Sequence, residues 1–266
     1  MTEIITSLQN QTVKLAAALK QKKQRDVTGL FIAEGVRLLE EVHLADWQVE
    51  ACLYTEAALQ HKRTEKIIHE LQDKGCRMLI VSEAVYLKVT DTEQPQGIMA
   101  IVKKKNQPLT RILQADCPLI VILDALQDPG NVGTVIRTAD AVGASGVILT
   151  KGCADVYSSK AVRATMGSLF HLPIFDGISY EEVVSSLRIA GVNLFATSLA
   201  SSNLYYEADF KKPAAVIFGN EGSGVHETLL NQADSAIFIP ILGKAESLNV
   251  AASAAVILYE AIRQRH

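Results

Sequence analysis

The sequence lacks the residue patterns of a disulfide framework, a metal centre and a membrane span. Its four cysteines, Cys52, Cys76, Cys117 and Cys153, form no CxxC pair, which predicts reduced, buried thiols in a cytoplasmic protein. The six histidines show no HExxH or similar spacing, so we expect no metal. The longest apolar run, residues 248–262, is interrupted by Asn, Ser and Glu, and the N-terminus has no apolar core or cleavage site. We therefore expect neither a signal peptide nor a membrane partner.

The chain also has no strong excess of charge of either sign. Its 266 residues carry a formal net charge of −3, which argues against a bulk binder of polyanions. Residues 1–105 hold 15 of the 26 basic and 14 of the 29 acidic side chains, which leaves 11 basic and 15 acidic side chains for the remainder. Basic residues stand at 14, 20, 22, 23 and 25 with no acid among them, and a second cluster lies at 103–105. Such clusters are either solvated surface or a binding surface.

Two apolar patterns are separated by a charged and polar stretch, KKKNQPLTRIL, at residues 103–113. We expect one domain at 1–105, a linker at 106–113 and a second domain at 114–266. The first region alternates short strands and helices, which favours a small α/β domain. Within it, residues 12–25 read as one amphipathic helix with a basic end.

The second region carries six apolar strand candidates with helical stretches between most of them. The candidates are residues 118–126, 146–151, 172–177, 192–200, 213–221 and 235–241. Apolar runs without alternation suit a parallel sheet that is covered on both faces. With 48% hydrophobic residues in the chain, such a core can be buried. We therefore predict an α/β fold with a parallel sheet.

The common phosphate-binding loops are missing from this region. There is no GxxxxGK[ST], and no GxGxxG follows the first strand. The sequence GNEGSG at 219–224 has another glycine order and follows the fifth strand candidate. These absences disfavour a P-loop protein, an NAD-type oxidoreductase and the common Rossmann methyltransferase.

Three segments remain, and each follows a predicted strand. The segment DPGNVGTVIRTADAVGA (128–144) offers Asn131 as a helix N-cap and places Arg137 about two turns into the helix. The segment GNEGSGV (219–225) carries Glu221 as its only charge among flexible glycines. Taken alone, Arg137 is better explained as a salt-bridging surface arginine. A merely flexible loop is the less favoured interpretation of the glycine run, because Glu221 is the only charge within it.

The third segment is IPILGKAESLNVAASAAVILYE (239–260). It enters a predicted helix at Leu248, with Ser247 as a candidate N-cap. Asn249 falls in the first turn, where alanine would be more favourable, so its amide needs a polar partner. No nucleophile, metal set or triad accompanies the three segments, and the combination therefore favours a group transfer that depends on positioning.

In this order, the three segments resemble motifs one, two and three of the SPOUT methyltransferases, specifically the TrmH/SpoU-like RNA 2′-O-ribose methyltransferases. The resemblance covers about residues 118–264. GLFIAEGVRLLEE (29–41) and QGIMAIV (96–102) resemble the N-terminal substrate-binding domain of that family. The resemblance implies a parallel α/β sheet with a C-terminal trefoil knot, S-adenosyl-L-methionine as cofactor, RNA as substrate, and a homodimer with the active site near the subunit interface.

The resemblance also implies roles for individual residues. Arg137 corresponds to the key catalytic residue, with Asn131 and Glu221 positioning it and the target nucleotide, and with Ser247 and Asn249 on the cofactor and RNA side. A guanidinium stays protonated at ordinary pH, so our hypothesis is that Arg137 grips RNA and polarises the hydroxyl rather than acting as a base. The implied cofactor-binding residues are Thr197, Ser198, Leu199, Gly219, Asn220, Gly222, Ile239, Ile241 and Leu248.

The first domain is expected to select the RNA. The candidate RNA-binding residues are Lys20, Lys22, Lys23, Arg25 and Arg37, whose contacts with phosphates would give affinity without sequence information. A separate N-terminal domain favours ribosomal RNA over tRNA. A tRNA 2′-O-methyltransferase and a non-catalytic RNA-binding or ribosome-assembly protein remain the alternatives.

Overall fold

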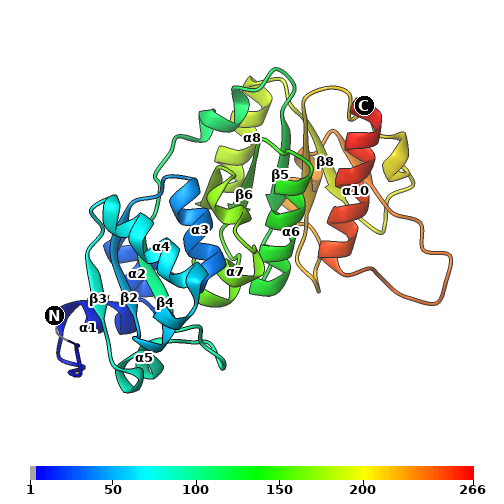
Figure 1. Cartoon of the computed structure of the whole chain (residues 1–266). Helices are drawn as coiled ribbons and strands as arrows, with labels where there is room; N and C mark the ends of the chain where they lie inside the picture. Colours follow the sequence, from blue (N-terminus) through cyan, green and yellow to red (C-terminus); the bar gives the residue numbers. More distant parts are fainter. Residues whose placement is uncertain (1–3) are drawn as a thin grey trace. The chain divides into compact units, whose positions relative to one another are not determined.

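The computed structural model describes residues 4–266, which form two compact units (Figure 1). One unit contains the residues up to Asn106 together with Tyr157–Phe170. The other contains Gln107–Val156 and His171–His266. None of the helices formed by residues 4–266 combines the length and the apolar character that a bilayer crossing requires.

The first unit is built on a four-stranded sheet in the order β1-β4-β2-β3. Strand β4 is antiparallel to β1 and β2, and β2 is parallel to β3. The strands are β1 (Leu30–Glu34), β2 (Val49–Tyr54), β3 (Met78–Ile80) and β4 (Ile98–Lys103). The helices are α1 (Gln11–Ala18), α2 (Lys22–Thr28), α3 (Val36–Leu44), α4 (Lys62–Asp73), α5 (Glu83–Val89) and α7 (Ser159–Ala164), with short 3₁₀ turns at Ala57–Gln60 and Ser168–Phe170. The α/β character predicted for this region is thereby confirmed.

The predicted single helix over residues 12–25 is wrong, because the structure has two helices, α1 and α2, with a break between them. The side chain of Arg25 explains the break. Its guanidinium is buried, and Nη1 donates to the carbonyl oxygens of Leu19 (2.6 Å) and Lys20 (2.8 Å). These carbonyls lie at the end of α1, where no further helical N–H is available to them.

An aromatic cluster holds Tyr157–Phe170 in the first unit. The ring of Phe31 lies 4.9 Å from that of Tyr157 and 6.3 Å from that of Phe170. Trp47 packs edge-on against Phe170, and its indole Nε1 donates to the Phe170 carbonyl over 3.0 Å. A buried indole N–H needs such an acceptor, so this bond fixes the end of the segment.

The second unit contains a six-stranded sheet in the order β10-β8-β9-β5-β6-β7. All of its strand pairs are parallel, as the apolar runs predicted. The strands are β5 (Leu119–Leu123), β6 (Gly146–Thr150), β7 (Ile174–Ile178), β8 (Asn193–Thr197), β9 (Ala214–Phe218) and β10 (Ser235–Ile237). Each of the six predicted strands is present, in a shorter form.

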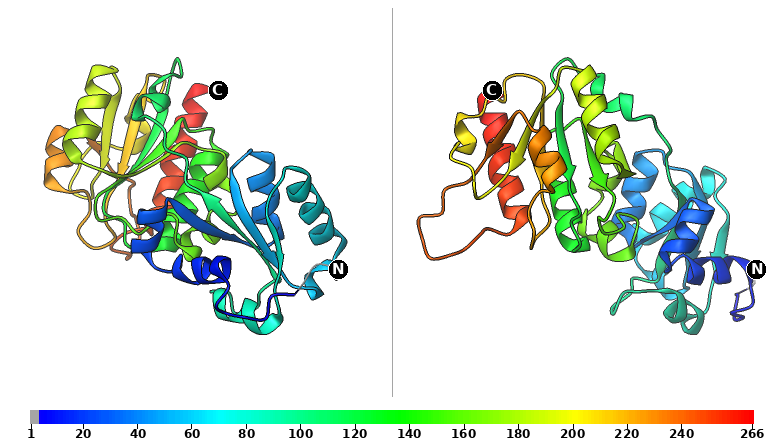
Figure 2. Two further views of the ribbon diagram at one scale, coloured as in Figure 1. Left: turned by 90° about the vertical axis from the view of Figure 1, so that its left-hand side faces the viewer. Right: turned by 180° about the vertical axis from the view of Figure 1, so that it is seen from behind.

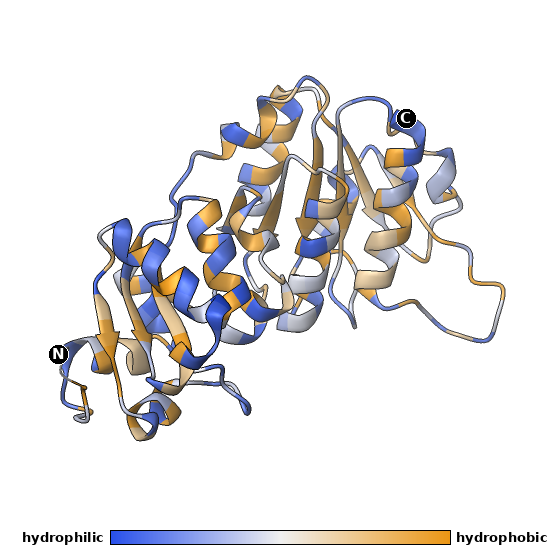
Figure 3. Cartoon of the chain, in the orientation of Figure 1, coloured by the Kyte–Doolittle hydropathy of each residue, from blue (hydrophilic) through white to orange (hydrophobic). Residues whose placement is uncertain are grey.

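Helices cover both faces of this sheet (Figure 2). Helices α6 (Pro129–Ala141) and α10 (Val250–Arg265) pack side by side on one face. On the other, Val183 and Leu187 of α8 (Tyr180–Ile189) and Leu229 of α9 (Glu227–Gln232) join the strands in one buried cluster. Ile112, in the 3₁₀ turn Leu109–Leu113, belongs to the same cluster. The central strands are hydrophobic along their length, whereas the helices alternate hydrophobic and hydrophilic positions (Figure 3).

Candidate active site

One large cavity lies at the carboxyl ends of β8, β9 and β10. Its volume is about 790 Å³, within the range of small-molecule sites. The loop after β9 and the segment between β10 and α10 form most of its wall. The structure brings all nine predicted cofactor-binding residues to this cavity: Thr197, Ser198, Leu199, Gly219, Asn220, Gly222, Ile239, Ile241 and Leu248. Glu221, Ser247 and Asn249 line it as well.

The first of the three sequence segments begins α6 beside this cavity. The N-cap is Asp128, whose Oδ1 accepts from the backbone N–H of Asn131 over 2.9 Å, and Pro129 follows in the first turn. The predicted N-cap Asn131 is therefore wrong by one helical turn. Because Asp128 performs the capping, the amide of Asn131 is free to bond elsewhere.

That amide joins the three segments in a hydrogen-bonded chain. Nδ2 of Asn131 donates to Oε1 of Glu221 over 2.9 Å, and Oδ1 of Asn131 accepts from Nδ2 of Asn249 over 3.1 Å. The two bonds use the donor and the acceptor of the same amide and so fix its orientation. One residue from each segment thus meets at the edge of the sheet, and Asn249 has the polar partner that its position called for.

The carboxylate of Glu221 is held from a further side. The backbone N–H groups of Gln127 and Asp128 point to it over 3.2 and 3.4 Å. Partial burial by itself would raise the pKa of Glu221, but the hydrogen bonds from Asn131 and from the backbone outweigh it and lower the pKa below its ordinary value. Glu221 is therefore a positioned, ionised carboxylate at the cavity wall.

The loop from Gly219 to Val225 has a closed shape that depends on glycine. The backbones of Asn220 and Gly224 exchange two hydrogen bonds of 3.0 and 2.9 Å. A Cβ atom on Gly219 would lie 2.1 Å from the backbone of Gly224 and Val225, so no other residue fits there. The side chain of Asn220 accepts from the N–H groups of residues 222 and 223 and donates to the Ala125 carbonyl over 2.8 Å.

Asp124 anchors the far end of this loop, and the sequence analysis did not single it out. The residue directly follows β5 and is 1% exposed. Oδ2 accepts from the backbone N–H of His226 over 2.7 Å, and Oδ1 accepts from Thr150 Oγ1 over 2.9 Å. The pKa of the nearby Tyr180 phenol is raised to about 12. Burial is the main cause, and a side-chain hydrogen bond with Asp124 is the next. An acid that directly follows a fully apolar strand was the available signal for this residue.

The other two predicted catalytic residues are placed differently. Ser247 lines the cavity but does not cap α10; the N-cap is Asn249, whose Oδ1 accepts from Ala251 N over 2.9 Å. The predictions of Ser247 as cap and of Leu248 as the first helical residue are therefore wrong by two positions. Arg137 is exposed on α6, outside both the cavity lining and the hydrogen-bonded chain. Among residues 4–266 its side chain has no hydrogen bond or ion pair.

The five predicted RNA-binding residues divide into two groups. Lys20 is engaged with Asp91 at 3.1 Å and with the Thr90 carbonyl at 2.8 Å, and Arg25 is buried at 4% exposure. The prediction that Arg25 contacts phosphates is therefore wrong, because its guanidinium serves backbone carbonyls inside the unit. The other group, Lys22, Lys23 and Arg37, is exposed.

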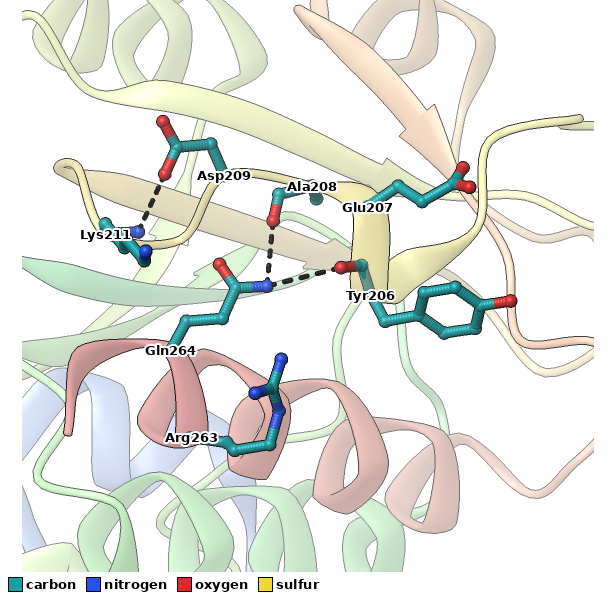
Figure 4. Close-up of a pocket in the computed structure, with 7 residues that line it drawn as sticks. All are labelled: Tyr206, Glu207, Ala208, Asp209, Lys211, Arg263 and Gln264. Atoms are coloured by element: carbon teal, nitrogen blue, oxygen red, sulfur yellow. Dashed lines mark hydrogen bonds between the residues drawn. The ribbon is translucent and has the colours of Figure 1, made fainter.

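A second, polar cavity of about 510 Å³ lies where the 3₁₀ turn Tyr205–Glu207 meets the end of α10 (Figure 4). Gln264 crosses it, donating to the carbonyl of Ala208 over 3.0 Å and accepting from Phe210 N over 2.9 Å. Arg265 donates to the carbonyls of Phe210 and Cys117, both over 2.8 Å. These side chains fasten the C-terminal helix to the segments that precede β9 and β5, and the anchoring accounts for the polar character of the cavity.

Comparisons with known proteins match both parts of the chain. The SpoU rRNA Methylase family matches residues 118–259, and the MRM3-like substrate binding domain matches residues 10–100. The chain is 37% identical over 255 residues to the 23S rRNA (guanosine(2553)-2′-O)-methyltransferase RlmP of Bacillus subtilis (strain 168), covering 96% of this chain and 97% of that protein. It is 33% identical over 266 residues to the 23S rRNA (uridine(2479)-2′-O)-methyltransferase of Streptomyces viridochromogenes, covering 98% of this chain and 92% of that protein.

A solved structure shares the fold over nearly the whole chain. The crystal structure of an AdoMet-bound rRNA methyltransferase from Sinorhizobium meliloti superposes with a TM-score of 0.89 at 38% identity, covering 98% of both chains. The order of the three segments, the hydrogen bonds that join them beside one cavity and these matches lead to one conclusion. The chain belongs to the SpoU rRNA methylase family.

Proposed function

We propose that this protein transfers a methyl group from S-adenosyl-L-methionine (AdoMet) to a ribose 2′-hydroxyl of 23S ribosomal RNA in the cytoplasm. The observation that carries the proposal is the chain of hydrogen bonds from Asn249 through Asn131 to Glu221, at the wall of the 790 Å³ cavity. Relatives that match over almost their full length are 23S rRNA 2′-O-methyltransferases, which supports the substrate class. They act on different nucleotides, so the position is left to experiment.

The cavity suits AdoMet in both size and lining. Leu199 and Leu248 are 65% and 41% exposed, and both line the cavity, where they offer apolar surface to an adenine ring. The closed loop from Gly219 presents backbone groups that would hold AdoMet, and Glu221 adds a negative charge that would attract its sulfonium cation. When bound, AdoMet supplies a methyl group on a sulfonium centre, which is a good leaving group.

The side chains around the cavity then have to place the hydroxyl in line and stabilise the charge that it develops. We propose that Asn131 and Glu221 hold the target nucleotide, while Ser247 and Asn249 contact the cofactor and RNA side. Arg137 binds a phosphate and polarises the hydroxyl, a role that needs no deprotonated guanidinium. Its exposure and its lack of a partner among residues 4–266 leave it available to RNA.

We further propose a homodimer in which Arg137 acts near the interface. Two observations support this: Arg137 does not line the cavity of its own chain, and α10, which packs against α6, exposes Val256 (37%) and Tyr259 (55%). Light scattering should give twice the 28.9 kDa chain mass. A Tyr259→Arg protein should be monomeric and inactive, and a fully active monomer would contradict the proposal.

We also propose that the C-terminal segment closes a trefoil knot. Strand β10 lies at the edge of the sheet beyond β8, whereas α10 returns to α6, which follows the central strand β5. This return, and the cavity that residues 238–249 share with the loops after β8 and β9, support a crossing of those loops by the C-terminal segment. Pulling the two ends apart in a single-molecule experiment should leave the chain shorter than its full contour length, and full extension would exclude the knot.

The first unit is proposed to bind the RNA, with Lys22 and Lys23 contacting phosphates. Both are exposed in the structure. Each lost phosphate contact should reduce the slope of log K against log salt by about 0.7–0.9. A Lys22→Ala/Lys23→Ala protein should therefore show a shallower salt dependence of RNA binding. The matched control is Lys62→Ala/Lys66→Ala on α4, and equal slopes for the two double variants would refute the assignment.

The test of the function is a map of 2′-O-methylated nucleotides by mass spectrometry in ribosomal RNA and tRNA, with and without the gene. We expect one methylation in 23S rRNA to disappear and to return with the wild-type gene but not with Arg137→Ala. If a methylation in tRNA is lost instead, the substrate class is tRNA and not ribosomal RNA. If no methylation is lost, or if Arg137→Ala restores it fully, the proposed reaction or the proposed role of Arg137 is wrong.

A further inference from the structure

A smaller cavity in the first unit has the features of a nucleotide-binding pocket. It has a volume of about 230 Å³ and lies where β1 ends and α3 begins. Its lining includes Glu34, Arg37 and Leu38 from this junction, and Arg163 and Met166 from the segment around α7. All of these residues belong to one unit. Arg163 and Met166 lie outside residues 10–100, the range that matches the substrate binding domain.

Two arginines at the cavity carry positive charge that the protein does not neutralise. Within residues 4–266, neither Arg37 nor Arg163 forms an ion pair. Arg163 makes one long hydrogen bond, from Nη1 to Thr92 Oγ1 over 3.4 Å. Arg37 is exposed, and Arg163 is partly buried. Two unpaired guanidinium groups beside one cavity are suited to a phosphate, which they can bind with several charge-assisted hydrogen bonds.

A buried carboxylate, Glu34, lies in the same cavity with one oxygen unoccupied. The residue is 8% exposed. Its Oε1 accepts from the hydroxyls of Tyr86 and Thr90, and in the part of the chain that the structure describes no donor reaches Oε2. Burial and the adjacent Glu34 raise the pKa of Tyr86, which keeps its hydroxyl a donor. Glu34 lines the cavity and its Oε2 is not among the buried atoms that lack a partner, so this oxygen is open to N–H donors of a ligand.

Apolar surface completes the cavity. Leu38 is buried beneath it, and Met166 is exposed beside it. Met166 has a left-handed backbone (φ 53°), and Gly167 follows with φ 106°. A Cβ atom on Gly167 would lie 2.6 Å from Cγ of Glu41, so the turn that presents Met166 is closely packed. The thioether and the leucine offer the kind of surface against which a base can stack.

We propose that this cavity binds one unpaired guanosine of the RNA substrate. Its base lies against Leu38 and Met166 and donates N1–H and N2–H to Glu34, and its phosphate lies between Arg37 and Arg163. Guanine is favoured because its Watson–Crick edge carries two adjacent donors, which match the two lone pairs of a carboxylate oxygen. Recognition of unstacked bases is the common mode of sequence-specific RNA binding. This inference deepens the proposed function and rests on it.

Fluorescence anisotropy with the full chain tests the pocket. The probes are four labelled nine-nucleotide single-stranded RNAs that differ only in the central base, flanked by uridines. We expect the guanine probe to bind most tightly to the wild type, and Arg37→Ala and Arg163→Ala each to weaken it about tenfold. The matched control is Arg77→Ala, which should bind as the wild type does. Arg77 is an exposed arginine of the same unit and lines none of the three cavities described above.

Glu34→Gln is the second variant, since it keeps the size of the side chain and an acceptor for Tyr86 and Thr90. It should abolish the preference for guanine while leaving the melting temperature close to that of the wild type. Preference of the wild type for another base, or for none, would overturn the guanosine assignment. Equal affinities for the Arg37, Arg163 and Arg77 variants would overturn the pocket.

Methyl transfer from AdoMet to 23S rRNA transcripts is measured in parallel with the wild type. If the wild type methylates this RNA and the pocket variants bind normally, the inference alone fails. If the wild type methylates no ribosomal RNA, the proposed function fails, whatever the binding assay shows.

Discussion

Replacing Gly219 by alanine tests whether the closed loop after β9 controls binding of AdoMet. The added Cβ atom would lie 2.1 Å from the carbonyl carbon of Gly224 and 2.1 Å from the amide nitrogen of Val225. Both atoms belong to the backbone and cannot rotate away as a side chain can. The loop therefore has to open, which breaks the two hydrogen bonds that Asn220 and Gly224 exchange.

The size of the effect follows from these two bonds. At about 0.5–1.5 kcal/mol each, closing the loop around the ligand costs the variant about 1–3 kcal/mol. This free energy raises the Kd for AdoMet by a factor of roughly 5 to 150. Isothermal titration calorimetry measures the Kd, and far-UV circular dichroism verifies that the variant is folded.

Gly243→Ala is the matched control. Gly243 lies in the segment between β10 and α10, where an added Cβ atom meets nothing within 4 Å and the backbone has no positive φ. The affinity of the Gly243→Ala protein for AdoMet should equal that of the wild type. A Kd of the Gly219→Ala protein equal to that of the Gly243→Ala protein would refute the reasoning.

Three further predictions concern residues with a defined structural role. Asn249→Ala removes the cap of α10, so the melting temperature should fall by about 2–4 °C for the roughly 1 kcal/mol that a cap contributes; Asn249→Ser should restore most of it, and an unchanged value for Asn249→Ala would exclude the cap. The pKa of Glu221 is lowered in the folded protein, so its stabilising contribution is complete above the ordinary pKa of a glutamate and is lost as the pH falls through the lowered pKa. Protonation removes the negative charge of Glu221, so AdoMet binding should weaken over that acidic range in the wild type but not in Glu221→Gln. Identical pH profiles of the two proteins would contradict a role of this charge in AdoMet binding. Arg25→Met leaves two carbonyls without donors, so urea unfolding should show a loss of about 2–4 kcal/mol; a loss no larger than that of the exposed Arg77→Met would argue against this.

The sheet of the second unit was predictable because its strands are continuous apolar runs. The run PLIVILDAL, for example, becomes β5, with every residue from Leu119 to Leu123 buried. A strand that is buried on both faces has no other composition open to it. The three polar segments were visible for the same reason, since they interrupt such runs at the strand ends.

The caps and the joining contacts were not predictable from the sequence. Each helix start offers two residues that can act as the cap, and only the backbone geometry decides between them. The pairs are Asp128 and Asn131 at α6, and Ser247 and Asn249 at α10. The bond between Asn131 and Asn249 joins residues 118 positions apart. Similarly, the break between α1 and α2 depends on the burial of one arginine side chain, which a helical pattern does not reveal.

The aromatic cluster around Trp47 has a consequence for the gene that encodes this chain. The segment Tyr157–Phe170 is inserted in the sequence of the second unit but completes the core of the first. A recombination event with a single crossover near codon 106 would therefore transfer an incomplete first unit and leave Tyr157 and Phe170 without their aromatic partners. Fusion proteins that exchange the N-terminal region should be insoluble unless codons 157–170 are exchanged with it, so the two units are inherited together although each has a core of its own.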